Sequence, residues 1–196
     1  MAALIGLEFD QAAAVAAEAA QGEVCQAAND NGAGQVVVSG DKAAVERAIE
    51  IAKGQGAKRA ALLPVSAPFH CALMRPAAEV VAEALAKVAV RRPCVPLVAN
   101  VAAKPVSEPT AIVDGLIAQV TGTVRWRESV AFMAGAGVGM FYEVGAGKVT
   151  SFAGTRGHRR SRTVSCASRC TPGPSASAAA SASGCCPSAS LQTTCW

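Results

Sequence analysis

Aromatic residues are scarce in this chain of 196 residues, at 4% of the sequence, although 52% of the residues are hydrophobic. A packed core built from Ala, Val, Leu and Ile fits this composition, and the length allows one or two small domains. No apolar run is as long as a membrane span, and the start of the chain has no basic segment before Glu8 and Asp10, as a signal peptide would. We therefore expect a cytoplasmic protein with reduced cysteines and no membrane association.

Acidic residues are absent from residues 151–196, which carry all of the net positive charge. Residues 1–150 contain 13 Lys and Arg against 14 Asp and Glu, whereas residues 151–196 contain five Arg and no acid. This segment also holds ten Ser and five Cys without apolar periodicity, so we expect a disordered or aberrant tail at 151–196. The abrupt change after Val149 suggests out-of-frame translation of a GC-rich gene, which the coding DNA would test.

Motifs for metals, phosphates and nucleic acids are also missing. Cys166 and Cys170 have no second Cys or His pair to complete a zinc site. Tyr142 and Val149 stand where a phosphate-binding loop needs Gly and Ser or Thr. The tail arginines have no interleaved aromatic residues for stacking on bases. We expect no metal, no bound cofactor and no nucleic-acid partner.

The segments that are present predict a mixed α+β and α/β protein. Strands are expected at 2–7, 23–28, 35–39 and 59–63, with helices after the capping residues Asp10 and Asp41. The order strand, helix, strand, strand, helix, strand predicts a ferredoxin-like subdomain over 1–63.

Residues 64–150 follow a different pattern. A proline-bounded loop at 64–70 precedes expected helices at 76–88, 111–120 and 129–134, alternating with short apolar strands at 95–100 and 139–144. The first of these strands is of the type found in parallel sheets. This alternation predicts part of an α/β core, because so few strands do not complete a covered sheet.

Histidine occurs only at positions 70 and 158. His70 follows Pro68 and Phe69 at the entry to a helix, where its side chain can point into a cleft between subdomains. A lone histidine is more often structural than catalytic, so its neighbours decide how it is interpreted.

Those neighbours belong to a set of segments that follow one another along the chain: 29–40 (NDNGAGQVVVSG), 43–47 (AAVER), 58–64 (KRAALLP), 64–74 (PVSAPFHCALM), 124–126 (VRW) and 142–149 (YEVGAGKV). In this order they resemble the malonyl-CoA:acyl-carrier-protein transacylases over about residues 1–150. The resemblance implies a ferredoxin-like subdomain set into an α/β-hydrolase-like acyltransferase core, acting in fatty acid biosynthesis.

The resemblance also implies a mechanism, in which malonyl passes from coenzyme A to a serine and then to the phosphopantetheine thiol of acyl carrier protein. His70 would be the base that activates the serine, and the main-chain carbonyl of Gln119 would orient its ring. Phe69 would exclude the extra methyl of methylmalonyl, worth only about 1–3 kcal/mol. Asn31 would lie near the acyl pocket. Judged without the resemblance, Gln119 is a polar residue at a helix end and Phe69 is a packing residue.

The sequence departs from the family in one essential respect, because it contains no Gly-x-Ser-x-Gly segment. The arginine that pairs with the malonyl carboxylate has no match either. This chain would supply a base without a nucleophile, so we expect it to be inactive alone.

Alternatives remain open at this point: a fragment of a polyketide synthase acyltransferase domain, or a non-catalytic ferredoxin-like binding module. The expected partners are malonyl-CoA and acyl carrier protein, and the expected state is a monomer. Arg75 and Arg125 could steer an acidic carrier protein, although ordinary solvated charges explain them better.

Overall fold

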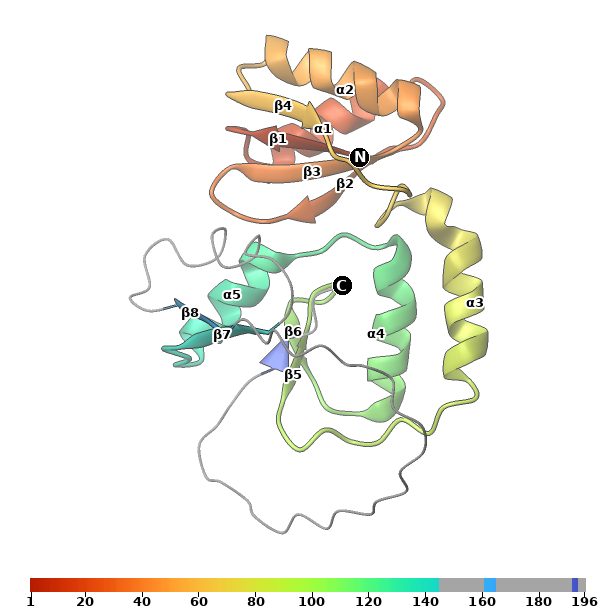
Figure 1. Cartoon of the computed structure of the whole chain (residues 1–196), viewed down its shortest axis with the longest axis vertical. Coiled ribbons are helices and arrows are strands. Elements are labelled where there is room, and N and C mark those ends of the chain that lie inside the picture. The colour runs from red at the N-terminus through yellow and green to blue at the C-terminus, as the bar shows by residue number, and fades with distance from the viewer. Residues whose placement is uncertain (145–160, 165–191, 194–196) are drawn as a thin grey trace.

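A computed structural model describes residues 1–144, 161–164 and 192–193. The elements before residue 63 follow the order expected from the sequence. They are β1 (Ala2–Ile5), α1 (Phe9–Ala20), β2 (Cys25–Asp30), β3 (Gln35–Gly40), α2 (Lys42–Gly54) and β4 (Arg59–Leu62). The four strands form one antiparallel sheet in the order β2-β3-β1-β4, and α1 and α2 pack on each other and on the sheet (Figure 1).

The core of this part is built from small and branched aliphatic side chains, as the composition predicts. Helix α1 buries residues spaced three and four apart, and α2 does the same, so each turns one apolar stripe toward the sheet. The largest fully buried side chains there belong to Leu4, Val15, Val36, Val38 and Val45.

The two expected helix caps are only partly right. Glu8, not Asp10, is the N-cap of α1, and its backbone N–H donates to Gln11 Oε1 at 3.0 Å. Asp41 does occupy the N-cap of α2, but its carboxylate accepts from the Val24 N–H at 2.8 Å instead of from the helix. Asp41 therefore ties the start of α2 to the residue before β2.

Residues 72–144 form the second part of the chain. Its elements are η1 (Ala72–Met74), α3 (Arg75–Leu85), β5 (Leu97–Ala99), β6 (Lys104–Val106), α4 (Pro109–Thr121), α5 (Trp126–Gly135) and β7 (Phe141–Val144). Helices α3 and α4 lie side by side (Figure 1), and a small core forms where Val98 meets Val130 and Met133. In the described part of the chain, no helix is both long and apolar enough to cross a membrane.

The strand pairings described for this part are partly parallel, as expected for residues 95–100, and partly antiparallel. Strand β5 pairs antiparallel with β6, with Leu97 opposite Val106, and parallel with β9 (Gln192–Thr193). Strand β7 pairs parallel with β8 (Ser161–Val164). Strand β6 was not expected, because its Pro105 argues against a central strand. It lies at the edge of the sheet, where a proline is tolerated. Strands β8 and β9 fall within the expected disordered tail, whose other residues lie outside the described ones.

Candidate active site

His70 lies in the loop between β4 and η1, in an uncommon backbone conformation. Its φ is +59°, in the left-handed region, which residues other than glycine seldom adopt but histidine tolerates better than most. The next residue, Cys71, is completely buried, and its thiol donates to the Pro68 carbonyl at 3.1 Å. The buried thiol therefore anchors the loop, while the imidazole beside it stays half-buried.

The His70 ring is held by a single main-chain oxygen. Its Nδ1 lies 2.9 Å from the carbonyl oxygen of Gln119. A carbonyl can only accept a hydrogen bond, so Nδ1 carries the proton in this arrangement. In the neutral imidazole the lone pair is then on Nε2, which is the nitrogen able to accept a proton from another group.

Gln119 can offer this carbonyl because of its place in α4. It lies in the last turn of the helix, where carbonyls have no partner within the helix. Its own side chain is buried, and Nε2 donates to the Gly122 carbonyl at 2.9 Å, which closes the turn after α4. A Cβ at Gly122 would lie 2.7 Å from the Ala118 carbonyl oxygen, so this turn requires glycine.

The residues after this turn join the second part of the chain to β2. Val124 forms an isolated parallel bridge with Asn29: its N–H donates to the Ala28 carbonyl at 2.8 Å, and its carbonyl accepts from the Asp30 N–H at 2.9 Å. The Thr123 hydroxyl donates to the Ala27 carbonyl at 2.8 Å. Figure 1 shows β2 as the strand of its sheet that faces α5, and these bonds occupy its edge.

An ion pair strengthens the same junction. The Asp30 carboxylate is buried, and its Oδ2 accepts from Arg127 Nε at 2.8 Å while Oδ1 accepts from the Gly32 N–H at 3.2 Å. Asn31 follows Asp30 in the turn between β2 and β3, where its N–H donates to the Gln35 carbonyl at 3.1 Å. The turn that carries Asn31 is therefore held by the Asp30 side chain and by the backbone bond from Asn31 to Gln35.

The structure thus brings together two of the four residues singled out from the sequence. His70 and Gln119 are in contact, Phe69 beside them is 40% exposed, and Asn31 lies in the turn after β2. The contacts that support the site from Thr123 and Arg127 belong to no sequence motif, so nothing in the sequence alone pointed to them.

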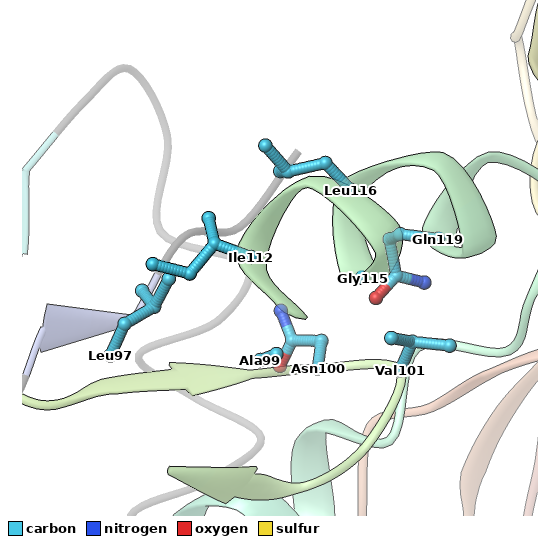
Figure 2. A pocket seen from close by; sticks show the side chains of 8 residues that line it. All are labelled: Leu97, Ala99, Asn100, Val101, Ile112, Gly115, Leu116 and Gln119. Carbon is cyan, nitrogen blue, oxygen red and sulfur yellow. The ribbon is translucent and has the colours of Figure 1, made fainter. Parts of the chain in front are cut away.

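A pocket lies against α4 (Figure 2). It is lined by Leu97, Ala99, Asn100, Val101, Ile112, Gly115, Leu116 and Gln119, and His70 is not among them. Figure 2 shows the pocket between strand β5 and helix α4, with the Gln119 carboxamide at one end. Gln119 therefore contacts the imidazole through its main chain and the pocket through its side chain.

A second ion pair, Arg125–Glu128, lies at the start of α5. Arg125 donates to both carboxylate oxygens of Glu128, and to the Ala102 carbonyl at 3.3 Å. Hydrogen bonding to Arg125 lowers the pKa of Glu128, and the bond to Glu128 raises that of Arg125. Burial raises the pKa of the Cys25 thiol at the start of β2, which keeps it protonated and unreactive. Within residues 1–144 and the two short strands beyond, no three His, Cys, Asp or Glu side chains gather as a metal site would need.

Known proteins similar to this chain were found by sequence and by structure. No protein-family model matches the chain. A malonyl CoA-acyl carrier protein transacylase of Escherichia coli (strain K12) is 50% identical over 149 residues, which make up 76% of this chain and 48% of that protein. The chain is homologous to malonyl-CoA acyl carrier protein transacylases. It spans about half the length of the curated transacylases that it matches.

Solved transacylase structures share its fold. The acyl-carrier-protein S-malonyltransferase of Bartonella henselae superposes with a TM-score of 0.79 at 48% identity, covering 83% of this chain and 52% of that one. A malonyl-transacylase in complex with its type II polyketide synthase acyl-carrier protein gives a TM-score of 0.80 at 39% identity, covering 83% and 53%. The structural similarity to these two transacylases therefore covers 83% of this chain.

Proposed function

We propose that this chain supplies the catalytic base of a malonyl-CoA:acyl-carrier-protein transacylase of fatty acid biosynthesis. The observation that carries the proposal is the bond between His70 Nδ1 and the Gln119 carbonyl, which leaves Nε2 as the proton acceptor. Its substrates would be malonyl-CoA and the phosphopantetheine thiol of acyl carrier protein, with no bound cofactor.

The proposed reaction has two displacements. Nε2 of His70 takes the proton of a serine hydroxyl as that oxygen attacks the malonyl thioester, and the protonated imidazole then returns the proton to the departing coenzyme A thiolate. In the second half, Nε2 takes the proton of the carrier-protein thiol, whose sulfur attacks the malonyl ester, and the serine oxygen leaves with the proton. The serine lies outside this sequence, which contains no Gly-x-Ser-x-Gly.

The remaining parts of the proposal concern architecture and selectivity. The βαββαβ order and the strand order β2-β3-β1-β4 support a ferredoxin-like subdomain at 1–63, followed by part of an acyltransferase core at 64–150. Phe69, exposed beside the imidazole, would meet the acyl group and exclude methylmalonyl, and Asn31 would border the acyl pocket. We place the protein in the cytoplasm as a monomer, and its free described cysteines fit a reducing compartment.

A chimera tests the central claim. The 149 matched residues of the E. coli transacylase are replaced by the corresponding residues of this chain, and malonyl transfer to holo acyl carrier protein is measured by mass spectrometry. We expect transfer by the chimera, and a loss of about 10²- to 10⁴-fold with His70→Ala. Transfer that survives His70→Ala at the unchanged rate would exclude His70 as the base.

A second test measures malonyl transfer by the 196-residue chain alone. We expect no malonyl transfer above background, because the imidazole has no hydroxyl to activate. Turnover comparable to that of the E. coli enzyme would contradict this. Binding of carrier protein by the isolated chain, together with an inactive chimera, would instead favour a non-catalytic binding module.

Polyketide synthesis is the second candidate setting for the same chemistry. It is favoured by the structural similarity to a malonyl-transacylase captured with a type II polyketide synthase carrier protein. The chimera distinguishes the two settings when it is offered a fatty-acid carrier protein and a polyketide carrier protein in competition. The ratio of malonylated products reports which carrier the residues of this chain prefer.

A further inference from the structure

Strand β2 touches both loops that form the His70–Gln119 contact. Consecutive residues of this one strand hold the histidine loop on one side and the segment after Gln119 on the other. The strand is itself braced by pairing with β3 on both sides of a bulge between Ala27 and Asn29, with Gln26 opposite Ser39 and Ala27 opposite Val38.

On the histidine side, the bond is made by Gln26. Its side-chain Oε1 accepts from the Ala72 N–H at 2.7 Å. Ala72 is the first residue of η1, and Cys71 before it gives that helix no side-chain cap. Gln26 therefore supplies from another element the acceptor that a capping side chain would normally provide.

On the Gln119 side, the adjoining residues of β2 make the bonds. The Ala27 carbonyl accepts from Thr123, and the Ala28 carbonyl accepts from Val124, two residues after the turn that the Gln119 side chain closes. Neighbouring residues of a strand are held at a rise of about 3.3 Å, so the two loops are fixed at a set separation.

We infer that Gln26 is a positioning residue for His70, which acts by fixing the histidine loop on the strand that also fixes the Gln119 loop. The inference rests on the proposed role of His70 as the base. Without the Gln26 bond, Ala72 and the loop before it lose this link to β2, and the Nδ1–carbonyl bond loosens. The proton of the neutral ring then distributes between both nitrogens, and Nε2 is no longer reserved as the acceptor.

Nitrogen NMR of the imidazole tests this inference without any need for acyl transfer. The full chain is labelled with ¹⁵N in a His158→Asn background, so that His70 is the single histidine. At alkaline pH, where the imidazole is neutral, the ¹⁵N shifts report the ratio of Nδ1-protonated to Nε2-protonated ring. We expect Gln26→Leu to lower that ratio by about twofold to tenfold, the equivalent of one net hydrogen bond, and to speed exchange of the Ala72 amide.

Two further variants separate positioning from a general effect on stability. Gln26→Glu keeps an acceptor oxygen and should restore the wild-type ratio. Gln55→Leu removes another exposed glutamine, whose side chain bonds Glu18 between α2 and α1 at 3.3 Å, and should leave the ratio unchanged.

Three results would overturn the inference: a folded Gln26→Leu protein with the wild-type ratio, a Gln26→Glu protein that resembles Gln26→Leu, or an equal change in Gln55→Leu. Failure of Gln26→Leu to fold would also overturn it, because an exposed side chain that only positions a loop is dispensable for folding. Failure of the proposed acyl transfer would instead appear in the chimera, with the NMR result intact.

Discussion

At the scale of single residues, His70 combines a strained backbone with a well-held ring. Its left-handed φ turns the chain sharply between the exposed Phe69 and the buried Cys71. Strain of this kind persists where the surroundings fix the residue, and here Cys71 and the Gln119 carbonyl do so on either side.

Two substitutions of His70 should therefore differ in stability. Asparagine tolerates the left-handed region, whereas alanine has no such tolerance, so we expect His70→Ala to be less stable than His70→Asn by about 1 kcal/mol. Urea unfolding followed by circular dichroism measures the difference. Equal stability of the two variants would mean that the backbone relaxes at this position.

Part of this site could be predicted from the sequence, and the rest could not. The residues around His70 and Gln119 match a family pattern, so their pairing could be expected from that resemblance. The positive φ of His70 could not, because histidine has no strong preference for it. The bonds from Gln26 and Thr123 could not be predicted either. The Gln26 bond joins residues 46 apart in the sequence and the Thr123 bond joins residues 96 apart, and neither follows a local rule.

At the scale of elements, the first turn of α5 holds a charged pair with a defined pH response. Hydrogen bonding to Arg125 lowers the pKa of Glu128 from its ordinary value of 4.5. A carboxyl group whose pKa is lowered by folding stabilises the folded state above its unfolded pKa, and this contribution is lost as pH falls through the lowered value.

Glu128→Gln should remove that contribution. We expect wild type to be more stable than the variant at pH 7, with the gap closing below pH 4.5 as Glu128 protonates. Both side chains are 39% exposed, so solvent screening keeps the gap below about 1 kcal/mol. Urea midpoints between pH 7 and pH 3 measure it, with Glu50→Gln in the more exposed pair with Lys53 as control. A gap that stays constant over this range would contradict the assignment.

The elements themselves were predicted unevenly. Both helices of the first 62 residues were expected after the capping residues Asp10 and Asp41, and both form there, each with a buried stripe at the helical spacing. The cap of α1 was misplaced, since Glu8 and Asp10 are both acidic and only the fold decides which begins the helix. Strand β6 was missed because a three-residue strand with a central proline leaves no periodic signal.

At the scale of the whole molecule, an ion pair between a buried carboxylate and a half-exposed arginine joins the two parts of the chain. The Asp30 side chain on β2 is 4% exposed, and its partner Arg127 comes from α5. Removal of the guanidinium would leave a buried carboxylate with only the Gly32 N–H as hydrogen-bond donor among the bonds described.

Arg127→Leu should accordingly destabilise the chain by about 1–3 kcal/mol, the usual cost of an unsatisfied buried polar group. Urea unfolding measures this loss, and Arg92→Leu is the matched control. Arg92 pairs with Glu108 at the surface, with both side chains more than 60% exposed, so its loss should cost less than about 1 kcal/mol. Equal effects of the two variants would show that the junction with β2 does not depend on this pair.

The bridge at Val124 also bears on self-association. A sheet can be lengthened by a second copy only at a strand with unpaired backbone groups, and the outer groups of Ala28 and Asp30 are already bonded. Among the strands described for this sheet, β4 is the other border, and it begins with the exposed Arg59. A charge on that border disfavours strand addition, and the Val124 bridge already occupies backbone groups of the opposite border.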